Sequence, residues 1–299
     1  MGKIKNVFHR PQLLLAHLVE NKGIAHLFSD EMYIKTLFRL RMGYPLDLSN
    51  PQSFNEKLNY LKLYDRNPLY HQLADKYLVK DFVKESVGEE YVVPCYGVWD
   101  TFDDIDFEQL PNQFVLKTTH DSSGVTICKD KSEFDTLLNR KKLDKDIKTN
   151  HFITAREWVY KNIQPRIIAD KYLDDHTGVT LRDYKFWCFN GIPHYMYCTI
   201  KGDGLYENFF DMDFKPVGIN HGFPRHQPEF EKPAGFELMK ELCCKLLSKI
   251  TVPFVRIDFF SVENHVYFGE FTFYDWGGMR PFADRKQDYE LGKLIELKR

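Results

Sequence analysis

Two acidic residues, Asp258 and Glu270, lie within apolar, aromatic-rich runs near the end of the chain. The runs span residues 254–260 and 266–273, and the polar residues 263–265 separate them, which predicts a β-hairpin. A turn centred on the middle of these three residues places the two acids directly opposite each other on one face. Facing carboxylates repel, so we expect a cation between them. Mg²⁺ completed by phosphates and water fits this pattern, and two acids facing solvent on an ordinary hairpin are the alternative.

Further charged residues occur earlier in the chain, close to predicted strands and helices. Lys117 ends an apolar run at 114–117 and precedes a loop of small hydroxyl residues that Gly124 closes, and the backbone amides of such a loop could hold phosphates. Lys76 falls on a predicted helix, and Asp170 falls on a predicted strand. Solvated lysines, a plain hairpin loop and an acid on an edge strand are the alternatives for these features taken singly.

A second hairpin is predicted over residues 183–200, with its turn at Asn190 and Gly191. Asp183 and Lys185 share one face of its first strand because side chains alternate between the two faces of a strand. The chain therefore offers two hairpins that each carry charged residues at spacings of two.

Helices are predicted around these strands. Ser53 and Glu56 have the spacing of a capping box, which opens a helix over 53–63. Pro68 begins a helix that is predicted to run to residue 84, and residues 236–250 form an amphipathic helix before the acidic hairpin.

The composition is that of a globular chain of one large domain or a few interlocked lobes. The 299 residues are 43% hydrophobic, and the formal net charge of -2 gives no reason to expect a nucleic-acid partner. No run of 18 apolar residues is present, so no membrane-spanning helix is predicted. The six cysteines show no CxxC spacing, which favours a reducing cytoplasm.

Residues 1–45 are predicted to be helical, without the cleavage site of a signal peptide. Basic residues precede the first apolar positions, namely Lys3, Lys5, His9 and Arg10. Packing of an amphipathic helix on the domain is one interpretation, and weak contact with the inner face of a membrane is the other.

The order of these pieces resembles the ATP-grasp fold, and most closely its TupA-like (teichuronopeptide biosynthesis) family. The resemblance covers the chain from about residue 33 to the end. It rests on SFNEKLNYLKL at 53–63, ADKYLVKDFV at 74–83, FVLKTTHDSSG at 114–124, IIADKYLDD at 167–175, DYKFWCFNG at 183–191, VRIDFF at 255–260, FGEFTFYDWGG at 268–278 and DYELG at 288–292. It implies an α+β fold in which two lobes hold ATP, with a helical region at 1–68, the ATP-grasp domain at 69–299 and a small lobe at about 112–175.

The resemblance also implies a nucleotide site. Lys76 and Lys117 resemble the two ATP lysines of the fold, and Asp170 stands where the fold usually has a glutamate that accepts from the adenine amino group. The loop over the β- and γ-phosphates would comprise His120, Ser122, Ser123 and Gly124. Backbone contacts to adenine would come from Lys171, Tyr172 and Leu173.

The catalytic and metal positions follow from the same resemblance. Asp183 and Lys185 match a DxK motif near the triphosphate, and Arg256 would steady a phosphoryl group or a substrate carboxylate. Asp258 and Glu270 match the Mg²⁺ ligands, for one or two ions. Thr272 replaces the asparagine that often serves as a further ligand, and its neutral hydroxyl is a weaker ligand.

The implied activity is ATP-dependent ligation of a carboxylate to an amine or a hydroxyl through an acylphosphate, in the biosynthesis of a bacterial surface or capsular polysaccharide. A glycosyltransferase using a nucleotide sugar, an ATP-dependent sugar kinase and a non-catalytic binding module are the alternatives. The expected partner is a small amino acid or a glycan. Candidate contacts to an anionic acceptor are His120, Lys201, Arg225, His226 and Arg280.

Overall fold

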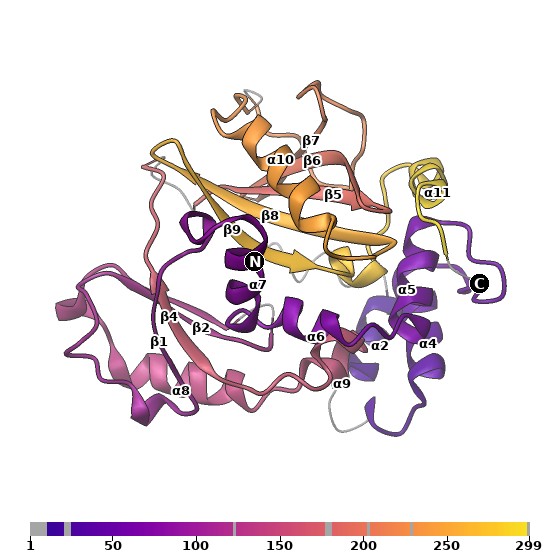
Figure 1. Cartoon of the computed structure of the whole chain (residues 1–299). Helices are drawn as coiled ribbons and strands as arrows, with labels where there is room; N and C mark the ends of the chain where they lie inside the picture. The colour runs from indigo at the N-terminus through magenta and orange to yellow at the C-terminus, as the bar shows by residue number, and fades with distance from the viewer. Residues whose placement is uncertain are drawn as a thin grey trace.

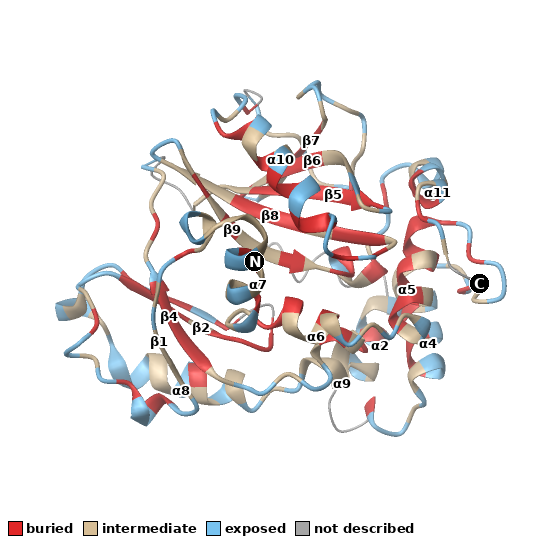
Figure 2. Cartoon of the chain, in the orientation of Figure 1, coloured by how far each residue is buried: buried red, intermediate tan, exposed pale blue. Residues whose placement is uncertain are grey.

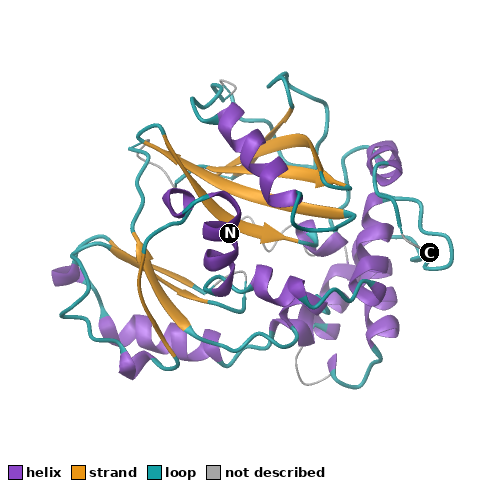
Figure 3. Cartoon of the chain, in the orientation of Figure 1, coloured by secondary structure: helices purple, strands orange, loops and turns teal. Residues whose placement is uncertain are grey.

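The computed structural model describes residues 11–20, 25–121, 124–176, 181–201, 204–227 and 230–297. These residues form two separate antiparallel sheets with helices around them (Figure 1, Figure 3), which confirms the predicted α+β class. In these described ranges, no helix is both long enough and apolar enough to cross a membrane.

The larger sheet has five antiparallel strands in the order β7-β6-β5-β8-β9. The predicted turn at Asn190 and Gly191 joins β5 to β6, and both residues adopt the left-handed conformation of a tight hairpin turn, with φ of 48° and 86°. The strands are β5 (Asp183–Phe189), β6 (Ile192–Lys201), β7 (Leu205–Asp211), β8 (Phe254–Val262) and β9 (His265–Thr272).

Helix α10 (Phe236–Leu247) covers one face of the larger sheet. The Phe236 ring lies 5.8 Å from the ring of Phe186, which follows Lys185 in β5. Because neighbouring residues of a strand point to opposite faces, Lys185 lies on the face away from α10. Helix α7 (Leu78–Val87) packs beside α10. Figure 2 shows strands β5 and β8 of the larger sheet as mainly buried.

The smaller sheet has four antiparallel strands in the order β1-β4-β2-β3. They are β1 (Cys95–Trp99), β2 (Phe114–Thr118), β3 (Val125–Cys128) and β4 (Ile167–Lys171). Helix α8 (Thr136–Ile147) packs on this sheet around a separate apolar cluster (Figure 1). The sheet reaches further back in the chain than the expected small lobe at about 112–175, because β1 pairs with β4.

The helix predicted over 68–84 is wrong as a single element. The structure has α6 (Leu69–Ala74) and then α7, separated at Asp75. The Asp75 carboxylate accepts hydrogen bonds from the backbone N–H groups of Tyr77 and Leu78, at 2.7 and 3.0 Å. A short acidic side chain that satisfies the first amides of a helix favours a new helix start over continuation of the preceding one.

The remaining helices gather at the right of the view in Figure 1, where α4 and α11 contact α5. The predicted capping box of Ser53 and Glu56 is present and opens α5, whose Phe54 ring stacks 5.0 Å from Trp187 of β5. Residues 1–10 and 21–24 of the expected helical region lie outside the described residues. The helices are α2 (Pro11–Val19), α4 (Asp30–Met42), α5 (Phe54–Tyr64), α9 (His151–Ala155) and α11 (Arg285–Lys293).

Candidate active site

Asp258 and Glu270 are directly paired across β8 and β9, which confirms the predicted register. The turn differs from the prediction, because only Glu263 and Asn264 form it, with φ of 51° and 65°. A turn of two residues by itself would set Asp258 opposite Gly269 and send the two carboxylates to opposite faces.

A β-bulge restores the pairing of the two acids. The register shifts by one residue between Asp258 and Phe259, opposite Gly269. A Cβ atom at Gly269 would lie 3.0 Å from the backbone oxygen of Asp258, so the missing side chain permits this close approach. The acidic pair therefore depends on a glycine that the sequence pattern alone did not single out.

Arg256 provides a cation between the two acids. Its Nε and Nη2 donate to the two oxygens of Asp258 at 2.7 Å each, and Nη2 also donates to Glu270 Oε1 at 3.1 Å. Asp258 is buried, whereas the Glu270 side chain is 39% exposed. The repulsion that suggested a metal ion is thus already reduced by a neighbouring residue of β8.

Lys185 extends the row of charges to β5. It is the register partner of Asp258, and its Nζ lies 2.5 Å from Asp183 Oδ2 and 3.4 Å from Asp258 Oδ2. Burial lowers the pKa of Lys185, but the Asp258 and Asp183 carboxylates together raise it by more, so the amine stays protonated.

Asp275 is a site residue that the sequence reasoning did not assign. Its Oδ1 accepts hydrogen bonds from Arg256 Nη1 and, at 3.0 Å, from the hydroxyl of Tyr197. Burial raises the pKa of Tyr197 well above its usual value, so this hydroxyl keeps its proton and donates. The signal in the sequence was an acid directly after the last apolar strand.

Asp170 and Lys117 come together on the smaller sheet. Asp170 is buried, and its Oδ2 lies 3.1 Å from Lys117 Nζ, while its Oδ1 lies 3.0 Å from Lys80 Nζ. Lys80 was not predicted, although it lies four residues after Lys76, a spacing typical of one helix face. The Asp170 carboxylate thus holds two lysines in place, in addition to the adenine contact expected of it.

The loop after β2 folds around the carboxylate of Asp121. Asp121 Oδ1 accepts from Thr118 Oγ1 at 2.7 Å and from the Gly124 backbone N–H at 3.1 Å. A side chain at Gly124 would collide with Thr118, so the glycine is required for close packing of the loop. Ser122 and Ser123 lie outside the described residues.

Lys76 lies between this loop and the acidic hairpin. Its backbone N–H donates to Thr119 O at 3.1 Å, and its Nζ donates to the backbone oxygen of Asp121. Burial lowers the pKa of Lys76, whereas the carboxylates of Glu270 and Asp121 oppose this shift and Lys117 adds to it. Lys76 is thus bound to the loop after β2, and the charge of Glu270 on the larger sheet acts on its pKa.

His120 packs into the protein close to the same loop. Its Nε2 lies 3.0 Å from Thr149 O, and its Nδ1 is buried without a hydrogen-bond partner. Burial lowers the pKa of His120. Its buried ring does not offer the exposed cation expected of an acceptor contact.

The segment expected to contact adenine continues from β4. Lys171 is exposed, and its backbone N–H donates to Pro94 O at 2.8 Å. Tyr172 is half-buried and Leu173 is buried. The Lys171 N–H is therefore engaged by Pro94 and is not available to adenine.

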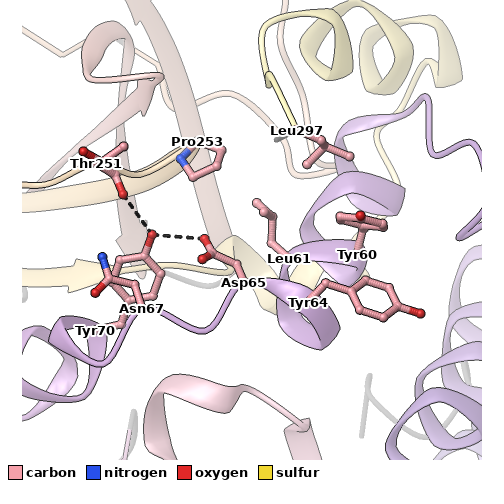
Figure 4. A pocket seen from close by; sticks show the side chains of 9 residues that line it. All are labelled: Tyr60, Leu61, Tyr64, Asp65, Asn67, Tyr70, Thr251, Pro253 and Leu297. Carbon is pink, nitrogen blue, oxygen red and sulfur yellow. Dashed lines mark hydrogen bonds between the residues drawn. The ribbon is translucent and has the colours of Figure 1, made fainter. Parts of the chain in front are cut away.

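Two cavities border this region without including the acidic hairpin. One of about 310 Å³ lies between α5, α6 and residues 251–253, and Figure 4 shows Asp65 and Tyr70 hydrogen-bonded at its wall. The other, of about 400 Å³, is lined by Lys80 and by residues of β1. Neither cavity contains Asp258, Glu270 or Arg256, which form a charged surface on the larger sheet.

Comparison with protein families identifies the chain. A profile described as TupA-like ATP-grasp matches residues 56–296. The chain belongs to this family. The match spans both sheets and the acidic hairpin of this TupA-like ATP-grasp protein.

Solved structures of ligases are similar to this ATP-grasp chain at low identity. D-alanine–D-alanine ligase from Helicobacter pylori is 17% identical over 82% of this chain and 67% of its own, with a TM-score of 0.45. The Bacillus anthracis enzyme complexed with ATP is 16% identical, covering 67% and 53%, with a TM-score of 0.37. The D-cycloserine synthetase DcsG is 12% identical, covering 76% and 71%, with a TM-score of 0.42.

The chain spans only about half the length of the Bacillus anthracis ligase, and these scores carry no conclusion about its activity. No curated protein shows a significant sequence match.

The donor atoms of the acidic hairpin fit Mg²⁺ bound together with a nucleotide. Among the described residues, no group of three or more His, Cys, Asp or Glu side chains is placed to hold a metal ion, so Asp258 and Glu270 would need phosphate and water as further ligands. Glu270 Oε1 accepts from Arg256 and Thr272, and each carboxylate oxygen has two acceptor positions. Thr272 Oγ1, expected as a ligand, donates to Glu270 at 3.1 Å and orients it.

Proposed function

We propose that this chain is an ATP-dependent ligase that joins a carboxylate to an amine. Membership of the TupA-like ATP-grasp family supports ATP as a substrate. The observation that carries the proposal is the paired acids Asp258 and Glu270 on the larger sheet, which Arg256 holds by hydrogen bonds to both. On the side of the smaller sheet, Lys76 is bound to the loop after β2.

The residues of the smaller lobe neutralise and position the phosphates. Lys76 and Lys117 supply point charges to the phosphates. The Gly124 N–H already donates to Asp121, so contacts of this loop to phosphate would come from its other backbone amides. Asp170 keeps Lys117 and Lys80 in place before the nucleotide arrives. Phosphoryl transfer needs this positioning and charge neutralisation more than covalent help from the protein.

The residues of the larger lobe act on the reacting groups. Asp258 and Glu270 would hold Mg²⁺, which would offset the negative charge of the phosphates. Arg256 donates all five of its N–H groups, to Asp258, Glu270, Asp275 and Tyr197, so its guanidinium holds these groups in position. A substrate carboxylate would bind Arg256 by taking the place of one of these acceptors. Lys185 and Asp183 lie at the end of the same row and complete the charged surface.

The reaction follows from these roles. A carboxylate oxygen of the substrate attacks the γ-phosphorus of ATP, which forms an acylphosphate and releases ADP. The nitrogen of an amine then attacks the acyl carbon, loses a proton, and displaces inorganic phosphate as the amide forms. We further propose that the acid belongs to a uronic-acid residue or an amino acid, in the biosynthesis of a bacterial surface polysaccharide.

Thermal shift measures nucleotide binding directly. The protein is heated with Mg-ATP, with Mg-UDP-sugars and without nucleotide, and a nucleotide that binds the folded state raises Tm. We expect stabilisation by Mg-ATP, and its loss in Asp258→Asn with Glu270→Gln. The matched control is Asp213→Asn with Glu290→Gln, two exposed acids outside the site. Stabilisation by a UDP-sugar with no response to ATP would contradict the proposal and favour a glycosyltransferase.

Product analysis separates a ligase from a kinase. The protein is incubated with Mg-ATP, the twenty amino acids and uronic acids, and the release of ADP is measured. A new amide with free phosphate supports the ligase. A stable phosphoester would show a kinase instead.

A further inference from the structure

Arg280 is placed between two aromatic side chains. Its guanidinium carbon lies 4.0 Å from the centre of the Phe223 ring and 5.3 Å from that of Trp276. Nε donates to His221 O at 2.9 Å, which fixes the side chain. The two rings and this hydrogen bond hold the planar guanidinium in one orientation.

No carboxylate of the described residues lies within ion-pair distance of Arg280. Arg166, which is half-buried like Arg280, is by contrast paired with Asp75 at 3.0 Å. Burial lowers the pKa of Arg280, and Glu207 opposes this shift from beyond ion-pair distance. The two carboxylate oxygens of Glu207 lie 3.0 and 3.1 Å from His221 Nδ1. A half-buried cation without an anion costs free energy unless a ligand supplies the charge.

Trp276 is held at the surface beside Arg280 by an unusual backbone. Its φ and ψ of 48° and 28° lie in the left-handed region, which costs free energy for a residue with a side chain, and 40% of Trp276 is exposed. Lys62 Nζ donates to the backbone oxygen of the next residue, Gly277, and so helps to maintain this turn. An exposed tryptophan held at such a cost is typical of a binding surface.

A chain of contacts links Arg280 to the proposed reaction centre. Arg256 Nη1 donates to the Tyr197 hydroxyl at 3.3 Å, and the Tyr197 ring lies 6.2 Å from the ring of His221, whose backbone oxygen accepts from Arg280. Two residues therefore separate the arginines. Arg280 is connected to Arg256 through the buried residues Tyr197 and His221, and no hydrogen bond or ion pair joins it to Asp258 or Glu270.

We propose that Arg280, with Trp276 and Phe223, binds a second carboxylate of the substrate, one that is not consumed in the ligation. This inference rests on the proposed ligase function for its place in the reaction. The two free Nη groups match a carboxylate in a bidentate geometry, and the indole supplies an apolar surface for the attached carbon skeleton. The carboxylate belongs to an amino acid or to a sugar acid.

Tryptophan fluorescence tests the anion site without requiring activity. Iodide quenching is measured in the full chain, and the contribution of Trp276 is obtained from the difference between wild type and Trp276→Phe. We expect Arg280→Gln to lower the Trp276 quenching constant at least threefold. Arg285→Gln is the matched control, since Arg285 also lies over an aromatic ring, Tyr44, at 4.0 Å, and we expect no change there.

Competition identifies the ligand class. At constant ionic strength, glutamate or glucuronate should protect Trp276 from iodide, while N-acetylglycinamide and glucose, which carry no carboxylate, should not. Protection by glutamate alone assigns an amino acid, and protection by glucuronate alone assigns a sugar acid. If neither carboxylate protects, or if Arg280→Gln is quenched as wild type is, the inference is overturned.

Kinetics of ADP release then connect the site to the reaction. With an active carboxylate substrate and Mg-ATP, Arg280→Gln should raise KM for that substrate 10- to 100-fold with kcat within about twofold, as expected for loss of a charged hydrogen bond. With a substrate whose second carboxylate is replaced by a carboxamide, wild type and variant should have the same KM and kcat. If the variant loses activity equally on both substrates, Arg280 has a structural role only. Carboxylate protection without any ADP release would reject the ligase function and leave the anion site standing.

Discussion

The carboxylates of Asp258 and Glu270 face each other across β8 and β9 and accept hydrogen bonds from one guanidinium, that of Arg256. The acids are therefore compensated before any ligand arrives, and the same guanidinium also reaches Asp275. Preorganised charge of this kind is useful in phosphoryl transfer because little reorganisation remains for the moment of reaction.

Arg256→Gln should destabilise the protein by roughly 3 kcal/mol, because it leaves Asp258 without its main cation. Urea unfolding measures the change. Mg²⁺ without nucleotide should recover more stability in this variant than in wild type, since a divalent ion replaces the missing charge. Arg140→Gln, which breaks an exposed pair with Asp103, is the control and should cost about 0.5 kcal/mol or less. Equal stability of the two variants would show that Arg256 does not hold the acids together.

Gly269→Ala should reduce the rise of Tm that Mg-ATP produces, and it should lower the free energy of unfolding only modestly. The added methyl would lie 3.0 Å from the Asp258 backbone oxygen, so β8 and β9 must separate at the bulge and the two carboxylates move. We expect about 1–2 kcal/mol of destabilisation and a smaller rise of Tm with Mg-ATP than in wild type. Gly218→Ala is the control, because a Cβ there meets nothing within 4 Å. An unchanged rise of Tm would show that the bulge does not set the nucleotide site.

Asp170→Asn should cost roughly 3 kcal/mol, because Lys80 and Lys117 would then face each other without a counter-charge. Lys117→Met should cost less, since Lys80 still pairs with the buried acid. Chemical denaturation of both variants gives the order of stability. The reverse order would mean that Lys117, and not Asp170, is the residue on which the cluster depends.

Lys62 should make stability depend on pH in the alkaline range. Burial lowers its pKa from 10.5 to about 8 in the folded protein, while Glu157 opposes the shift. Between these values the unfolded chain holds the proton and the folded chain releases it, so stability rises with pH, by at most about 1.4 kcal/mol per pH unit. Below pH 8 the cost of the buried charge is fully present.

The comparison of wild type with Lys62→Met isolates this contribution from that of other alkaline groups. Urea unfolding at pH 7.5 and pH 9.5 should give a larger increase in the free energy of unfolding for wild type. The same change with pH in both proteins would show that Lys62 keeps its proton on folding.

Local patterns in the sequence were sufficient for the elements that bear the site. Alternation with a period of two placed Asp183 and Lys185 on one face of β5. The pairing of Asp258 with Glu270 was predicted from a three-residue turn, whereas it arises from a two-residue turn and a bulge. Capping and turn residues act through their nearest neighbours, so the start of α5 at Ser53 and the β5–β6 turn followed from sequence alone. The family resemblance, which depends on order and spacing along the chain, was also open to sequence reasoning.

Tertiary structure decided which charges meet. The contacts of Asp170 with Lys80, of Arg256 with Asp275 and of Lys76 with the Asp121 loop join residues from different elements, and no local period encodes them. The turn is one residue shorter than predicted, and the bulge at Gly269 restores the pairing of Asp258 with Glu270. The arrangement of Arg280 between Phe223 and Trp276 likewise arises only when loops far apart in the chain pack together. Side-chain direction is a local property of the backbone, whereas the partner of a charge depends on how the whole chain folds.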